Sequence, residues 1–294
     1  MELARRTAEL PWGPVSYLEW VAPAASRAST VVLLHGGGLD SAWLSWGGVG
    51  GALAAAGHRV IAPDHPGYGR SPKAPWPASQ QHLLAYVKGF VDALALDRFA
   101  LGGLSMGAGL AIGHVLAHPQ RVSGLMLLGA YGLSPTLVEG RWSAAAQLAS
   151  WAATRAGLLK ALSRSTAGSR ALLERSLRPV LRNPEQRTPE LIDAVMEEAR
   201  RGSGIAAFGE FQREEVGRRR QSTDYSARLA TIETPTLFVH GERDMGVPAS
   251  LARRAALAMP DARVLIVPDA GHWVQRDRPE VVIPAMREFL DGLH

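Results

Sequence analysis

The chain has 294 residues, of which 47% are hydrophobic and 20% are charged, and this ordinary globular usage excludes a disordered or fibrous protein. It contains no cysteine, which excludes disulfides, cysteine nucleophiles and thiolate metal sites. The formal net charge of +5 comes from arginines that are spread along the chain without interleaved aromatic residues, so we expect no nucleic-acid partner.

The N-terminal segment, MELARRTAELPWG, lacks the apolar core of a signal peptide. The longest apolar runs, such as residues 125–128, are much too short to cross a bilayer. We therefore expect a cytoplasmic protein with no membrane partner, either a monomer or a homodimer. The densest basic run, residues 218–220, follows Glu214 and Glu215 and is interpreted as part of a solvated helix face.

Short apolar runs alternate with longer helical patterns, which predicts a parallel sheet wrapped by crossover helices. At the start of the chain, the PWGP turn predicts a hairpin between residues 6–10 and residues 15–21. The other predicted strands are 30–34, 59–63, 99–102, 122–128, 236–240 and 263–267, and the predicted helices are 79–95, 106–117, 249–258 and 279–290.

The alternation stops between residues 134 and 222, where Ala, Leu, Arg and Glu recur at helical spacing. The clearest helices there are WSAAAQLASWAATRAGLLKAL and TPELIDAVMEEARR, and the connectors are LRNPEQRTPE and RGSG. We predict an α/β core in two parts, 1–133 and 223–294, interrupted by a helical cap at 134–222. An insertion of this size on the ligand-binding side of an α/β sheet predicts a lid over a crevice at the strand ends.

The stretch GGLSMG follows a predicted strand and precedes a predicted helix. Gly103, Ser105 and Gly107 form a Gly-x-Ser-x-Gly pattern, in which a very tight turn needs small residues two positions before and after the serine. Such a turn directs the serine Oγ into the crevice and leaves the Met106 N–H free to bind an oxyanion. The pentapeptide alone is also compatible with a glycine-rich turn before a closely packed helix, so other residues must decide.

A second glycine run, HGGG, follows the predicted strand at residues 30–34. Its glycines free the backbone to direct another N–H at the same oxyanion, and we assign this donor to Gly37 and a substrate contact to Gly38. His35 is interpreted as holding the loop through hydrogen bonds. A phosphate-binding loop is excluded because no Gly-Lys-Ser/Thr follows.

The segments FVHGERDMGVP and VPDAGHWVQ each follow a late strand and supply a carboxylate and an imidazole. We assign Asp244 as the residue that orients the base and His272 as the base itself, because each lies in a loop at the end of a predicted strand, where both can converge with Ser105. Asp269 lies only three residues before His272 and is better placed to shape that turn. Trp273 is assigned to substrate binding.

Together, HGGG, DHPGYGRS, GLSMG, GERD and AGHW resemble the α/β-hydrolase superfamily in their order and spacing, and the resemblance covers nearly the whole chain. It implies a serine hydrolase with Ser105 as nucleophile, Asp244 and His272 completing the triad, and neither a metal nor an organic cofactor. The helical middle of the chain is similar to the cap domain that interrupts the core of many members.

Within this superfamily, HGGG, the Met after the serine and the Trp after the histidine resemble the meta-cleavage product hydrolases, which split carbon–carbon bonds in vinylogous diketo acids. That group has Asn before the serine, where this chain has Leu104, and a cap arginine near the position of Val195. Arg200 or Arg201 could replace that arginine, although pairing with a neighbouring glutamate is the commoner role for an arginine on a helix.

Because both polar groups are missing, we expect a carboxylesterase that cleaves a small-molecule ester with a small or medium acyl or aryl group, lactones and thioesters included, through an acyl-enzyme. Carbon–carbon bond hydrolysis is the alternative reaction. A slow-turnover ligand receptor and a perhydrolase also stay open, whereas an aspartate-nucleophile dehalogenase or epoxide hydrolase does not fit a serine at the turn. Candidates for an apolar pocket under the cap are Trp43, Trp46, Trp76, Trp142, Trp151 and Trp273.

Overall fold

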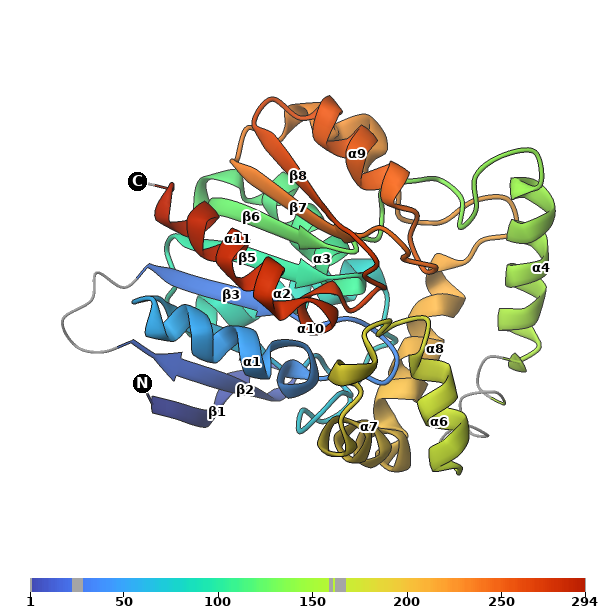
Figure 1. Ribbon diagram of the computed structural model, residues 1–294, viewed down its shortest axis with the longest axis horizontal. Coiled ribbons are helices and arrows are strands. Elements are labelled where there is room, and N and C mark those ends of the chain that lie inside the picture. Colours follow the sequence, from blue (N-terminus) through green and yellow to red (C-terminus); the bar gives the residue numbers. More distant parts are fainter. Residues whose placement is uncertain (1, 23–28, 159–160, 162–167, 294) are drawn as a thin grey trace.

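An eight-stranded sheet forms the centre of the molecule, with strand order β1-β2-β4-β3-β5-β6-β7-β8 (Figure 1). The computed structural model describes residues 2–22, 29–158, 161 and 168–293. Strands β1 and β2 form an antiparallel hairpin, β2 pairs antiparallel with β4, and all the later pairs are parallel. The strands are β1 (Glu2–Leu10), β2 (Gly13–Val21), β3 (Thr30–Leu34), β4 (Arg59–Pro63), β5 (Phe99–Leu104), β6 (Val122–Leu128), β7 (Thr236–Gly241) and β8 (Ala262–Val267).

Helices cover both faces of the sheet, and this is why the central strands are apolar along their whole length rather than at alternate positions. One hydrophobic cluster packs α2 (Gln80–Ala93), α3 (Met106–Ala117) and α9 (Ala249–Ala258) on one face. The other cluster packs α1 (Ala42–Ala55), α10 (Val274–Asp277) and α11 (Pro279–Asp291) on the opposite face. The mostly parallel sheet flanked by helices confirms the predicted fold class, and every predicted core strand is present.

Helix α1 is the longest core element that the sequence pattern did not reveal; the short α10 was not predicted either. The sequence of α1, AWLSWGGVGGALAA, is apolar on all sides and rich in glycine, so it lacks both the helical periodicity and the helix propensity that mark a helix. One of its glycines is required by packing, because a Cβ at Gly50 would lie 2.7 Å from atoms of the Trp20 ring. Ser41 begins the helix by accepting a hydrogen bond from the Leu44 N–H at 3.3 Å.

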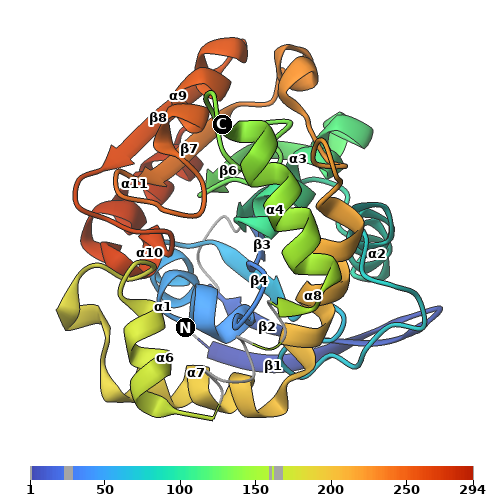
Figure 2. The same cartoon turned by 90° about the vertical axis from the view of Figure 1, so that its right-hand side faces the viewer.

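The described residues between β6 and β7 form four α-helices and add no strand to the sheet. They are α4 (Ser143–Arg155), α6 (Arg170–Leu177), α7 (Pro189–Arg201) and α8 (Ser203–Glu215). In Figures 1 and 2 they stand beyond the carboxyl ends of the parallel strands. This is the position expected for a cap, and its boundaries at 134 and 222 stay a prediction.

The sequence located α4 and α7 but not α6 and α8. The end of the predicted first cap helix, at 159–160 and 162, lies outside the described residues. Helix α7 begins at Thr188, which accepts from the Leu191 N–H at 3.3 Å, and it ends at Gly202 in the left-handed conformation (φ 70°). The basic run 218–220 is exposed as expected, but it lies after the end of α8 rather than on a helix.

No helix among the described residues is long and apolar enough to cross a membrane.

We predict opposite effects of alanine at two neighbouring positions of α1. A Cβ at Gly48 meets nothing within 4 Å, so Gly48→Ala gains helix propensity and raises the free energy of unfolding by about 0.5–1 kcal/mol. Gly50→Ala forces the Trp20 ring to move and therefore lowers the free energy of unfolding by about 1–3 kcal/mol. Urea denaturation of both variants measures these changes, and equal effects at the two positions would contradict the described packing.

Candidate active site

Ser105 stands on a strained turn between β5 and α3. Its backbone has φ 52° and ψ −114°, a conformation that a residue with a side chain rarely adopts. A Cβ at Gly103 would lie 2.3 Å from the backbone of Gly107, and a Cβ at Gly107 would lie 2.3 Å from the Leu34 carbonyl oxygen. The turn can therefore form only with glycine at both positions, as the Gly-x-Ser-x-Gly pattern predicts.

His272 and Asp244 form a direct hydrogen bond, with 2.7 Å between Nδ1 and Oδ2. Asp244 follows β7 and His272 follows β8, so neighbouring parallel strands bring the two loops together. The other carboxylate oxygen of Asp244, Oδ1, accepts the N–H groups of Gly246 at 2.7 Å and Val247 at 3.0 Å. The carboxylate is thus fixed by its own loop and presents Oδ2 to the imidazole.

This contact changes the acidity of both groups. Burial favours the neutral form of Asp244, but hydrogen bonds from His240 and His272 outweigh burial and hold its pKa below the ordinary value. Burial also disfavours protonated His272, but the Asp244 hydrogen bond and charge, with a smaller contribution from Asp40, raise its pKa above the ordinary 6.5. Asp244 is therefore ionised, and His272 is a stronger base than a free histidine.

A single backbone segment after β6 adjoins both Ser105 and the histidine–aspartate pair. The Ser105 N–H donates to the Leu128 carbonyl at 2.8 Å. At the next residue, Gly129, a Cβ would lie 3.1 Å from His272 Nδ1 and Cε1 and 3.3 Å from Asp244 Oδ2. The three residues that the sequence assigned to a triad therefore gather around residues 128–129, at the carboxyl end of the sheet.

The loop after β3 is held by two buried side chains. His35 donates from Nδ1 to the Gly36 carbonyl at 2.7 Å and accepts the His65 N–H at Nε2, 2.9 Å away. Burial lowers the pKa of His35 to about 3, so the ring is neutral, and these contacts agree with the interpretation that it holds the loop.

Asp40 is a second anchor of this loop, and sequence reasoning missed it. Its carboxylate accepts the Gly36 and Ser41 N–H groups, each at 2.8 Å, and the Ser45 hydroxyl at 2.7 Å. Burial raises its pKa to about 6 against the lowering effect of these donors. No sequence signal separates Asp40 from an ordinary loop aspartate, because its partners are defined only once the loop has folded.

The assigned oxyanion donors lie at the two turns described above. In the described part of the chain, the N–H groups of Gly37 and Met106 donate no hydrogen bond to protein. Gly38 has φ 81°, which favours glycine. The Phe208 ring of α8 packs on this loop so closely that a Cβ at Gly37 would lie 2.3 Å from it. The roles of these N–H groups stay a prediction, as does the contact of Gly38 with substrate.

Trp273 is 6% exposed and belongs to the hydrophobic cluster around α1 and α11, so its substrate contact also stays a prediction. The other tryptophans do not form one pocket: Trp46 is fully buried, whereas Trp43 and Trp142 are 45% and 65% exposed. Asp269 is a surface residue with φ 56° that pairs with Arg243 at 2.7 Å, as expected of a residue that shapes the turn.

His240 is another residue that sequence reasoning missed. It is fully buried in β7 and donates from Nε2 to the Val247 carbonyl at 2.8 Å. The same nitrogen lies 3.3 Å from Asp244 Oδ2. His240 therefore contacts both Asp244 and Val247 in the loop between β7 and α9 (residues 242–248), here called the acid loop. It also contributes to the low pKa of Asp244. A histidine in a buried strand carries no sequence signal for this role.

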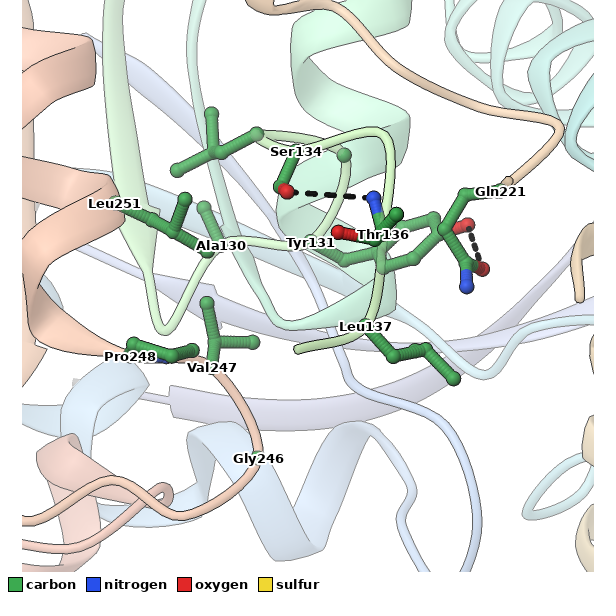
Figure 3. Close-up of a pocket in the computed structure, with 12 residues that line it drawn as sticks. Ala130, Tyr131, Ser134, Thr136, Leu137, Gln221, Gly246, Val247, Pro248 and Leu251 are labelled. Atoms are coloured by element: carbon green, nitrogen blue, oxygen red, sulfur yellow. Dashed lines mark hydrogen bonds between the residues drawn. The ribbon is translucent and has the colours of Figure 1, made fainter. Parts of the chain in front are cut away.

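An apolar pocket adjoins the acid loop and the segment after β6 (Figure 3). Figure 3 shows Ala130, Val247, Pro248 and Leu251 along one side of it, and Tyr131 hydrogen-bonded to Gln221 on the other. Its remaining lining residues are Gly132, Leu133, Ser134, Thr136, Leu137 and Gly246. Because Tyr131 N–H donates to the Ser105 carbonyl at 3.2 Å, the pocket lies beside the candidate nucleophile.

Among the described residues, no group of three or more His, Cys, Asp and Glu side chains is arranged to hold a metal ion.

The profile of the alpha/beta hydrolase fold family matches residues 30–279, which is most of the chain. The chain belongs to the alpha/beta hydrolase fold family. A 2-hydroxy-6-oxononadienedioate/2-hydroxy-6-oxononatrienedioate hydrolase from Cupriavidus pinatubonensis is 31% identical over 90% of this hydrolase and 87% of its own length. A 2-hydroxy-6-oxo-6-phenylhexa-2,4-dienoate hydrolase from Burkholderia cepacia is 28% identical over 90% and 89% of the two chains.

A crystal structure of a meta-cleavage product hydrolase from Pseudomonas fluorescens superposes on this hydrolase with a TM-score of 0.78, at 22% identity, over 98% of each chain. This likeness shows the shared fold. The resemblance to this superfamily that the sequence motifs indicated is confirmed.

The expectation of a carboxylesterase is wrong, because relatives that align along nearly the whole chain are named carbon–carbon bond hydrolases. The error has a physical cause. A serine triad and an oxyanion loop attack any activated carbonyl carbon, so these groups do not distinguish ester from ketone substrates. The expectation therefore rested on Leu104 and Val195, which concern how a substrate is held rather than which bond breaks.

We predict a pH profile controlled by His272. Only the neutral imidazole accepts the serine proton, so kcat/KM falls as pH drops through a pKa above 6.5. Asp244→Asn removes the group that raises this pKa, so the midpoint moves to lower pH and kcat/KM at pH 8 falls about 10³- to 10⁴-fold. Acylation by 4-nitrophenyl acetate is a convenient reporter.

Asp269→Asn is the matched control for this experiment, because Asp269 is a surface aspartate on the same loop as His272. It should leave both the rate and the midpoint unchanged. A wild-type midpoint below 6.5, or a midpoint that Asp244→Asn does not move, would contradict the described contact.

Proposed function

We propose that this hydrolase cleaves a carbon–carbon bond next to a ketone in a vinylogous diketo acid. The observation that carries the proposal is the similarity, along about nine-tenths of the chain, to hydrolases of 2-hydroxy-6-oxo-dienoates. The candidate nucleophile, base and acid at Ser105, His272 and Asp244 supply the groups that this chemistry needs. Cytoplasmic localisation and the domain boundaries are proposed with it.

The first half-reaction forms an acyl-enzyme. His272 takes the proton of Ser105 Oγ, and Oγ bonds to the ketone carbon C6 of the substrate in its 2-keto tautomer. The N–H groups of Gly37 and Met106 stabilise the resulting oxyanion. The C5–C6 bond then breaks, and its electron pair passes from C5 through the C3=C4 double bond to the C2 oxygen. Protonated His272 returns its proton to the C2 oxygen, which releases a 2-hydroxydienoic acid product.

The second half-reaction frees the enzyme. His272 takes a proton from water, the hydroxide attacks the acyl carbon, and the same N–H groups bind the new oxyanion. The bond between Oγ and the acyl carbon breaks, and His272 returns the proton to Ser105. The net change is the addition of water to the 2-keto tautomer, with OH on the acyl carbon and H on the C2 oxygen of the dienoic acid product. Ionised Asp244 stabilises protonated His272 in both halves.

The pocket beside the acid loop supports a hydrophobic group on the acyl side of the substrate. Ala130, Leu133, Val247 and Leu251 give it an apolar lining, and it adjoins the backbone of Ser105 through Tyr131. Part of a hydrophobic substituent on C6 would be desolvated there. We propose that this pocket holds the part of the substrate that becomes the acyl group.

The acid end of the substrate must be held without the polar groups of the meta-cleavage group. Leu104 and Val195 are both fully buried in the hydrophobic cluster around α1 and α11. Arg201 is engaged elsewhere: its guanidinium pairs with Glu197 and donates to the Gly69 carbonyl at 2.9 Å. The carboxylate of the substrate therefore needs a different anchor.

We expect kcat/KM for 2-hydroxy-6-oxo-6-phenylhexa-2,4-dienoate to exceed that for 4-nitrophenyl butyrate, because relatives that align along nearly the whole chain are named for dienoate hydrolysis. Loss of the dienoate absorbance and release of nitrophenol measure the two rates on the same enzyme preparation. Ser105→Ala should lower both by at least 10³-fold, because it removes the nucleophile.

Ser176→Ala serves as a comparison variant, since Ser176 is an exposed residue of α6 that belongs neither to the serine turn nor to the pocket, and it should retain turnover of both substrates. Dominant ester turnover that depends on Ser105, with no cleavage of the dienoate, would overturn the proposal.

A further inference from the structure

The start of α8 is an uncapped helix end that lies beside the loop after β3 (residues 35–38), here called the oxyanion loop. Gly202 precedes the helix, no side chain caps it, and its first turn contains no acidic residue. The N–H groups of Ser203, Gly204 and Ile205 donate no hydrogen bond within the described part of the chain. Such an end of a 13-residue helix carries partial positive charge and favours an anion.

The ring of a tyrosine with a buried, unpartnered hydroxyl lies against this helix end. Tyr68 is 2% exposed, and its hydroxyl makes no hydrogen bond in the part of the chain that is described. A buried hydroxyl left unpaired is costly, so an acceptor is expected to complete it. The backbone around Tyr68 is fixed, since its N–H donates to the His65 carbonyl at 2.8 Å.

Three segments converge at the ring of Tyr68. A Cβ at Gly204 would lie 2.9 Å from Tyr68 Cδ1 and 3.1 Å from the Gly38 carbonyl oxygen, so only glycine lets α8 approach the ring and the loop. Burial raises the pKa of Tyr68, and an interaction with the Gly38 backbone opposes this rise. The hydroxyl therefore lies near the oxyanion loop, although it makes no hydrogen bond there within the described part of the chain.

We propose that Tyr68 Oη and the first N–H groups of α8 bind the carboxylate of the substrate, in place of the arginine that Val195 replaces. The inference rests on the proposed function, because it names the group that selects the acid end of that substrate. Tyr68 has a proton to donate and nothing to accept it, and the helix end offers further donors, so the ligand must supply acceptor oxygens and negative charge.

The position of Tyr68 suits a substrate that extends from Ser105. Its ring belongs to the same hydrophobic cluster as Met106, whose N–H is the candidate oxyanion donor. The loop residue Gly38 directly follows Gly37, the other candidate donor. A dienoate chain that leaves the oxyanion loop toward α8 would therefore bring its carboxylate to Tyr68, with the acyl group in the pocket on the acid-loop side.

The first test removes only the hydroxyl. In a Ser105→Ala background, which binds substrate without turnover, absorbance titration gives the Kd of 2-hydroxy-6-oxo-6-phenylhexa-2,4-dienoate and of its C1 methyl ester. Adding Tyr68→Phe should weaken binding of the acid about tenfold and leave the methyl ester unchanged, since a hydrogen bond to a charged acceptor is lost. Tyr17→Phe, at a buried tyrosine of β2, is the matched control and should change neither.

The second test adds charge at the helix end. Ser203→Asp places a carboxylate on the first residue of α8, where it stabilises the helix but repels an anionic ligand. We expect an unchanged or higher Tm together with at least tenfold weaker binding of the acid. Ser143→Asp, the same change at the first residue of uncapped α4, should leave binding unchanged.

The outcomes separate the inference from the proposed function. Equal Kd values for the acid in the Tyr68→Phe and parent enzymes would mean that the hydroxyl meets only a structural water, and would overturn the inference even where the wild type cleaves the dienoate. A wild type that does not cleave the dienoate, but whose Ser105→Ala form binds the acid through Tyr68, would overturn the proposed function and leave the inference standing.

Discussion

The close approach of two backbone segments beneath Ser105 is the constraint on which the whole site depends. The carbonyl oxygens of Leu34 and His35 lie where a side chain at position 107 would begin, so β3 and α3 meet with nothing between them. The oxyanion loop leaves β3 at this point, and the serine turn leaves β5 next to it. Their contact therefore sets the spacing between the candidate nucleophile and the N–H groups that face it, and a preorganised spacing of this kind is the main source of catalytic power in such sites.

Charge is arranged around this scaffold so that Asp244 and His35 each have a defined protonation state. Asp244 stays ionised because its loop amides and two histidines compensate for burial. His35 stays neutral because burial opposes its charge. The candidate nucleophile, acid and base thus follow strands of the sheet, whereas Phe208 and the first turn of α8 come from the inserted segment. Substrate selection can change with this segment while the chemistry stays the same.

The fold could be predicted from the sequence because buried parallel strands are continuous apolar runs. The candidate triad was assigned because its residues follow strands in a fixed order, and its catalytic role stays a prediction. Helix α1 was missed because its glycines serve packing against Trp20 and not helix propensity. Asp40, His240 and Tyr68 were missed because tertiary contacts alone define their roles. The reaction was misjudged for a related reason: the sequence displayed the atoms that attack a carbonyl, and the missing Asn and Arg were taken to decide which bond breaks.

Labelling by a fluorophosphonate, located by peptide mass spectrometry, tests the central claim that this turn and the histidine–aspartate pair make Ser105 a nucleophile. We expect one phosphonyl group per chain, attached to Ser105 Oγ, and labelling slowed by at least 100-fold in Asp244→Asn, because the imidazole then loses its orienting carboxylate. An unmodified Ser105 in folded protein, or a label on another residue, would contradict the account.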